Sequence, residues 1–128
     1  MKGKLFLTYF ARLKYVPKEY KTCRISRTVP NGINLDYLFP NLYPTKLLLS
    51  FYKSNKIDFN EYTQRYLEHA LTVGQPDILN IKEKLDNGEN LVLVCYEKNH
   101  LCHRFILGSI FEHLGYEVNE IWKNWLVS

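Results

Sequence analysis

The sequence has no apolar run long enough to cross a membrane. A spanning helix needs about 20 consecutive apolar residues, and no segment approaches that length. Lys2 and Lys4 precede only a short apolar segment, and no small-residue cleavage motif follows it, so we expect no secretory leader. We therefore expect a cytoplasmic protein that makes no contact with a membrane.

The chain also has few cysteines and a low net charge. Three cysteines are an odd count, and in a cytoplasmic protein we expect their thiols to be reduced and either buried or chemically used. The formal net charge of +4 is weaker than the basic stripe of a dedicated nucleic-acid-binding protein. This charge allows a ligand that carries phosphate but does not require one.

What the sequence does contain is enough for one domain with one core. Its 128 residues are too few for two ordinary domains, so we expect a single domain over residues 1–128. Aromatic residues make up 15% of the chain. This abundance favours an aromatic-rich packed core. The alternative is that aromatic side chains form a surface on which ligands stack.

The pattern of apolar and turn residues predicts an α/β fold. We expect strands at 4–10, 20–26, 90–96 and 117–122, and helices at 45–55, 58–73, 78–85 and 102–114. The last strand, helix and strand form a βαβ unit, whose strands should be parallel. The prediction is a small three-layer α/β sandwich, Rossmann-like in the loose sense, with a mostly parallel sheet of about four strands.

The segment Val29–Pro44 is predicted to be irregular but packed. It contains three prolines and an Asn-Gly pair, which are turn signals, together with several apolar and aromatic residues. Long ordered loops in compact domains are often lids or binding loops. We therefore expect this segment to cover a ligand pocket.

The residues best suited to chemistry lie between the strand at 90–96 and the next helix. In open α/β sheets, ligands sit beyond the carboxyl ends of the strands, where Cys95 and Tyr96 are expected. Cys102, His103 and Arg104 begin the following helix, whose positive end favours anions and thiolates. The sequence therefore predicts an anion site at the helix that starts at Cys102.

Each of these side chains also has a plainer interpretation. Cys102 could be a nucleophile, His103 an acid or base, and Arg104 a fork for phosphate or carboxylate. At the end of an apolar strand, Cys95 is more simply a small buried residue. Arg104 could instead be the ion-pair partner of an acidic residue such as Glu97 or Glu112.

Three more familiar kinds of site fit this segment poorly. Cys95, Cys102 and His103, with His100 or Cys23, could ligate zinc, but Cys-x6-Cys-His is not a common zinc pattern. A phosphatase-like Cys-x5-Arg loop is absent, and the lack of glycine between the first cysteine and the arginine excludes a glycine-rich phosphate loop. We expect no metal and no other cofactor.

Several motifs resemble the family catalogued as domain of unknown function 488. The resemblance covers most of the chain and rests on these segments: Leu7–Ala11, Cys23–Arg27, Tyr43–Leu48, Glu61–Tyr66, Leu93–Lys98, Cys102–Arg104 and Gly115–Glu120. The loop Asn99–Leu101 departs from the family's pattern, as does the segment after Pro30, which lacks a tryptophan and glycine pattern. A changed loop could mean a changed ligand.

The resemblance implies a Rossmann-like fold found in bacterial and phage proteins, without an established reaction. It implies a site made of Cys95, Glu97, Cys102, His103 and Arg104 and, more weakly, Tyr62, Arg65 and Tyr66. The roles are our own expectation and not the family's. We expect catalytic roles for Cys102, His103 and Glu97, and ligand binding by Arg104, Cys95, Tyr96, Arg65 and Tyr62.

Two functional hypotheses remain open beside a third, a fold stabilised by zinc, and the sequence does not decide whether the protein is an enzyme. In the first, the domain binds or processes a nucleotide, a nucleobase or a nucleic-acid end, with Arg104 holding the anionic part. In the second, it is a non-catalytic phage or bacterial interaction module. Its protein partner would then contact the aromatic segments 37–43 and 122–125.

Overall fold

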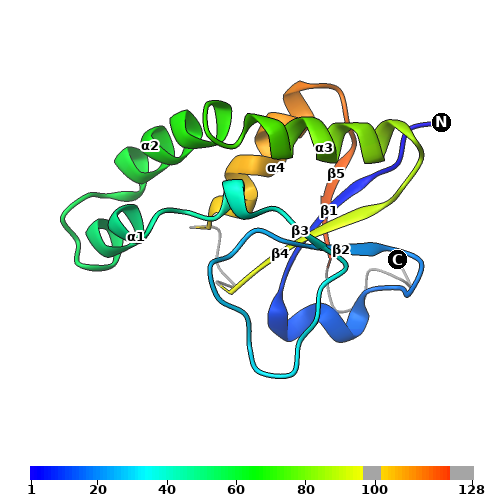
Figure 1. Cartoon of the computed structure of the whole chain (residues 1–128), viewed down its shortest axis with the longest axis horizontal. Helices are drawn as coiled ribbons and strands as arrows, with labels where there is room; N and C mark the ends of the chain where they lie inside the picture. The colour runs from blue at the N-terminus through cyan, green and yellow to red at the C-terminus, as the bar shows by residue number, and fades with distance from the viewer. Residues whose placement is uncertain (97–101, 122–128) are drawn as a thin grey trace.

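A computed structural model describes residues 1–96 and 102–121. Five parallel strands form the sheet of this part of the chain, in the order β3-β2-β4-β1-β5 (Figure 1). Their bounds are β1 Leu5–Tyr9, β2 Lys21–Arg24, β3 Tyr37–Leu38, β4 Leu91–Cys95 and β5 Val118–Glu120. The predicted α/β class and parallel sheet are confirmed, with five strands rather than about four.

The two central strands, β1 and β4, are apolar because both faces of the sheet are covered. They pair along their whole length, from Leu5 beside Leu91 to Tyr9 beside Cys95, and every residue of β4 is buried. A strand that is buried on both faces needs no polar alternation. The continuous apolar run that marked β4 in the sequence therefore reflects its central position.

Four α-helices cover one face of the sheet, and a 3-10 helix with adjoining loops covers the other (Figure 1). The helices are α1 Lys46–Lys53, α2 Phe59–Leu71, α3 Gln75–Asp86 and α4 His103–His113. The opposite layer contains the 3-10 helix η1 Phe10–Tyr15, a segment for which the sequence predicted no helix. Among the described residues, none of the helices is long and apolar enough to span a membrane.

The loop predicted to cover a pocket is built into the fold instead. It supplies the edge strand β3 and the 3-10 helix η2 Pro40–Leu42. Asp36 accepts hydrogen bonds from the backbone and hydroxyl of Thr22, which fixes β3 beside β2. Phe39 and Leu42 are buried in the main core. Phe39 and Leu42 therefore do not belong to an exposed aromatic contact at 37–43, whereas Pro44 at the end of the segment lines the cavity described below. The other predicted contact segment, 122–125, lies outside the described residues.

Local capping explains where α2 begins. The Asp58 carboxylate accepts a hydrogen bond from the backbone N–H of Glu61 at 2.9 Å, the usual interaction of a helix N-cap. At the start of α1, Thr45 caps Leu48 in the same way. These two caps set the helices that form one wall of the candidate site.

Candidate functional site

The carboxyl end of β4 and the first turn of α4 meet at the same place, as predicted. Cys95 is the last residue of β4 and Cys102 is the N-cap of α4. Alternate residues of a strand share a face, so Cys95 points to the same side as Leu91 and Leu93, which face the helices. Glu97 and His100 lie outside the described residues.

The sulfur atoms of Cys95 and Cys102 are in direct contact and can be joined as a disulfide. Their Cα atoms are 7.7 Å apart, which is wider than the roughly 4.4–6.8 Å of ordinary disulfides. A relaxed covalent bridge would therefore need the backbone to move. Both cysteines are buried. In the reduced state expected from the sequence, their two thiols would lie in contact beneath the surface. We call this pair the sulfur cluster.

His103 is held in one tautomer beside this cluster. Its Nε2 lies 2.7 Å from the carbonyl oxygen of Ile25; a carbonyl can only accept, so Nε2 carries the proton. The other ring nitrogen, Nδ1, then has a lone pair and lies 3.7 Å from the Cys102 sulfur. Burial, opposed by the Ile25 hydrogen bond, lowers the pKa of His103 to about 4. The imidazole is therefore neutral at pH 7.

Arg104 is turned into the protein rather than toward a ligand. Its side chain is 0% exposed; Nη1 donates to the Cys95 sulfur at 3.1 Å and Nη2 to the Glu120 carboxylate at 3.2 Å. The guanidinium also lies over the Phe105 ring, 4.4 Å from its centroid. The ion-pair interpretation of Arg104 holds, with Glu120 of β5 as the observed partner.

Next to this cluster lies a cavity of about 490 Å³. Cys102 and His103 line it and are nearly buried, so they form its floor. The other described lining residues are basic, aromatic, or small and neutral, and none is acidic. They are Arg27, Lys46, Lys53, Tyr52, Tyr62, Tyr96, Ser26, Thr28, Pro44 and Leu49.

The structure brings together some of the predicted ligand-binding residues and separates others. Tyr62 and Tyr96 both line the cavity. Arg65 instead pairs with Glu61 on the surface of α2 and borders a different hollow. Tyr66 is fully buried behind the site, where its hydroxyl donates to the Leu42 carbonyl. Cys95 and Arg104 lie beneath the floor and do not line the cavity.

Sequence reasoning missed the cations of the cavity. Arg27 follows β2, while Lys46 and Lys53 lie at the two ends of α1. Arg27 and Lys46 fall in segments quoted for the family resemblance, but nothing local gives them a role. The spacing Lys46–Lys53 is the one usable signal, because residues seven apart lie on the same face of a helix.

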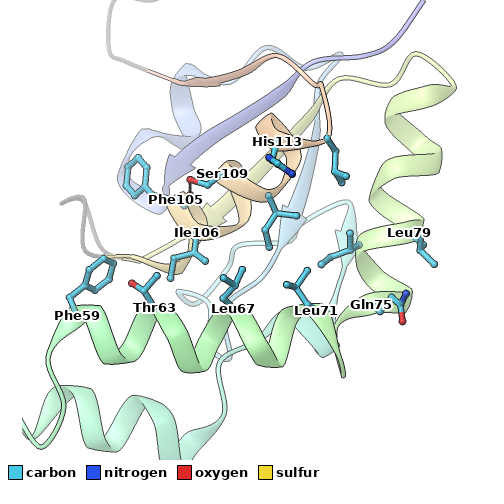
Figure 2. A pocket seen from close by; sticks show the side chains of 13 residues that line it. Phe59, Thr63, Leu67, Leu71, Gln75, Leu79, Phe105, Ile106, Ser109 and His113 are labelled. Carbon is cyan, nitrogen blue, oxygen red and sulfur yellow. Dashed lines mark hydrogen bonds between the residues drawn. The ribbon is translucent and has the colours of Figure 1, made fainter.

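A second hollow, of about 710 Å³, lies between α2, α3 and α4 (Figure 2). Its lining is mostly apolar: Leu67 and Leu71 face it from α2, and Phe105 and Ile106 from α4. Leu71 and Leu79 are more than half exposed. Among the residues that the structure describes, those lining this groove include none of the cations, thiols or tyrosines of the first cavity.

The comparisons with known proteins point to a single family. Neither curated proteins nor solved structures gave a match. A family model described as "DUF488-N3a: Active DUF488-N3 subclade" matches residues 9–115. That span runs from the end of β1 to the turn after α4 and includes the sulfur cluster, His103 and the cations of the cavity. The chain belongs to the DUF488 family, in the N3a subclade.

Proposed function

We propose that the cavity beside Cys102 binds a nucleotide or a related phosphate-bearing base, and that Cys102 and His103 are where it is processed. One observation carries the proposal: a single cavity combines tyrosines, cations and a thiol–imidazole floor, with no acid among its described lining residues. Its volume of about 490 Å³ lies within the roughly 300–1,000 Å³ typical of small-ligand pockets.

The aromatic wall suits a planar ring. Tyr52 and Tyr62 lie with ring centroids 4.7 Å apart, and Tyr62 is held in turn against Tyr66. Packed tyrosines of this kind are rigid, and a base can stack on them at little entropic cost. Tyr96, at the end of β4, borders the cavity from the sheet side.

The cations suit an anionic group. Lys46 and Lys53 are exposed at the rim, and Arg27 donates a hydrogen bond to the Pro44 carbonyl at 3.3 Å. That bond holds the arginine across the mouth between β2 and α1. This anion site differs from the one predicted at Arg104, whose charge is engaged by Glu120 and the Cys95 sulfur.

The floor supplies groups able to react. The lone pair on His103 Nδ1 faces the Cys102 sulfur, so a reduced Cys102 can donate a hydrogen bond to it. Burial lowers the pKa of His103 to about 4, which keeps the imidazole neutral at pH 7 but makes it a weak base. The proposal therefore assigns the reacting atom to Cys102 and its orientation to His103.

Thermal unfolding against a ligand panel tests the proposal. The panel holds phosphate, nucleobases, nucleosides, nucleotides and short oligonucleotides. A ligand at one hundred times its Kd stabilises by about 2.7 kcal/mol, a shift of about 10 °C for a chain of this length. We expect nucleotides to produce the largest shift, and Lys46→Ala and Lys53→Ala to reduce it.

The control is Lys18→Ala, which removes an exposed lysine outside the cavity. Equal loss of the shift in all three lysine variants would indicate a general charge effect and contradict a defined site. A panel with no shift, or with the same shift for phosphate alone as for every nucleotide, would also refute the proposal.

A second candidate function, the interaction module, is favoured by one observation. The groove between α2, α3 and α4 leaves Leu71 and Leu79 exposed (Figure 2), and monomeric proteins rarely expose large apolar patches. A self-association through this groove would appear as a concentration-dependent mass in sedimentation, abolished by Leu71→Glu. A protein that stays monomeric at all concentrations and still binds nucleotide would contradict self-association, and nucleotide binding would be the only function proposed.

A further inference from the structure

We propose that Cys95, Cys102 and His103 form a metal site for a thiolate-preferring divalent cation such as zinc. The metal site itself stands independently of nucleotide binding. Only its fourth coordination position, which would face the cavity, rests on the proposed function. The inference reverses the expectation from sequence spacing, because the fold gathers ligands that the spacing did not suggest.

The ligand atoms already converge. The two sulfurs and a ring nitrogen of His103 lie within 4.8 Å of one another, and all three residues are buried. With metal–sulfur and metal–nitrogen bonds of about 2.3 and 2.0 Å, ligand atoms of a tetrahedral site lie roughly 3.5–3.8 Å apart. The Cys102 sulfur and His103 Nδ1 are 3.7 Å apart.

The backbone spacing suits two thiolates on a metal better than a disulfide. The Cα atoms of Cys95 and Cys102, 7.7 Å apart, are too far apart for a relaxed disulfide. When a metal lies between two cysteine sulfurs, their Cα atoms can be farther apart than in a disulfide, because two metal–sulfur bonds replace one sulfur–sulfur bond. The sulfurs would separate to admit the ion, and the wide Cα spacing gives them room to do so.

His103 is oriented as a metal ligand commonly is. Its Nε2 donates to the Ile25 carbonyl at 2.7 Å, leaving the lone pair of Nδ1 directed toward the sulfurs. Metal-binding histidines almost always donate their second ring N–H to a carbonyl or carboxylate, which fixes the tautomer. The Ile25 carbonyl would serve this purpose without any rearrangement.

The surrounding charges also balance around a divalent ion. Arg104 donates to the Cys95 sulfur and pairs with Glu120, both within the protein. Two thiolates, one divalent cation, one guanidinium and one carboxylate sum to zero formal charge. Without the ion the two cysteines would be neutral thiols, because burial disfavours the thiolate, so a metal would bind with release of their two protons.

The consequence for the proposed function is a change of role for Cys102. As a ligand it would no longer act as the nucleophile. Three protein ligands leave one position for water, and a bound metal makes that water a nucleophile at neutral pH. Cys102 and His103 form the cavity floor, so that water would sit beside a bound nucleotide.

Metal content and a cobalt spectrum test the site. The full chain is purified under reducing conditions, incubated with zinc and desalted, and its zinc content is measured by mass spectrometry. We expect one zinc per chain in the wild type and in Cys23→Ala, whose buried cysteine lies outside the cluster. Cys95→Ala and Cys102→Ala should each lose the bound zinc.

Cobalt replacement keeps the test decisive if the cysteine variants fail to fold. Wild-type protein loaded with Co²⁺ should show thiolate-to-cobalt charge-transfer absorption and the intense visible bands of tetrahedral cobalt. A wild-type protein that retains no zinc and gives only the spectrum of aqueous cobalt would overturn the proposal. A chain lighter by two hydrogens and free of metal after reducing purification would also overturn it, in favour of a disulfide.

The same samples separate this inference from the proposed function. Lys46→Ala and Lys53→Ala should keep the zinc while losing the nucleotide-induced shift, because neither lysine belongs to the cluster. A nucleotide shift in a protein that binds no metal refutes the metal site alone. Bound zinc in a protein with no nucleotide shift refutes nucleotide binding alone.

Discussion

Replacing Arg104 with alanine should destabilise the protein strongly, because the arginine belongs to a buried ion pair. Its side chain is 0% exposed and that of its partner Glu120 is 9% exposed. Removing one member of a buried pair leaves the other charge without compensation and costs about 3–5 kcal/mol. The sequence had suggested the opposite, a loss of binding without a loss of stability.

The expected effect is large enough to measure by heat or urea. At about 2.1 cal/mol/K per residue, a chain of 128 residues loses about 3.7 °C in Tm for each kcal/mol. Arg104→Ala should therefore lower Tm by about 11–19 °C. Arg65→Ala is the matched control: it breaks an ion pair whose side chains are 51% and 45% exposed, which should cost less than about 1 kcal/mol.

A double-mutant cycle separates the ion pair from the rest of the arginine's packing. Once Arg104 is replaced by methionine, the Glu120 carboxylate is the unpaired charge, so adding Glu120→Gln should recover part of the lost stability. A coupling free energy above about 1 kcal/mol is expected for such a contact. An Arg104→Ala protein with wild-type stability that no longer binds nucleotide would refute this reasoning and restore the anion role.

Three smaller changes test individual contacts of the fold by urea denaturation. Tyr66→Phe should cost about 1–2 kcal/mol, because it removes the buried hydrogen bond to the Leu42 carbonyl; an unchanged midpoint would mean that this carbonyl finds another donor. Asp58→Ala should cost about 1 kcal/mol through loss of the α2 cap, while Asp58→Asn should cost little. Gly3→Ala should cost about 3 kcal/mol, since its Cβ would lie 1.8 Å from the Glu89 carbonyl oxygen; wild-type stability would contradict this close approach.

The elements that flank the site could be predicted because their signals are local. The apolar run of β4 needs both faces covered, and Gly115, with a φ of +95°, ends α4 where the sequence placed its end. The strand β3 carries no such signal. It is two residues long and is positioned by Asp36 binding Thr22, a contact across 14 positions that no short pattern reveals.

In the site itself, only the proximity of residues that are close in sequence could be predicted. Cys95 and Cys102 are only seven positions apart, at the end of a strand and the start of a helix, so their proximity follows from the sequence. The inward turn of Arg104 does not follow from the sequence, because it depends on Glu120 of β5, on the far side of β1 from β4. The cations of the cavity were missed for the same reason.

The arrangement of charges implies that ligand binding and sulfur chemistry can be altered separately. Arg104 lies beneath the floor, where it donates a hydrogen bond to the Cys95 sulfur and is paired with Glu120. Lys46 and Lys53 act at the rim of the cavity, on the solvent side of Cys102. Variants at the rim should therefore change ligand affinity while leaving the reactivity or metal content of the cysteines as it is. Variants beneath the floor should change the sulfur cluster first, and any loss of ligand binding should follow from that change.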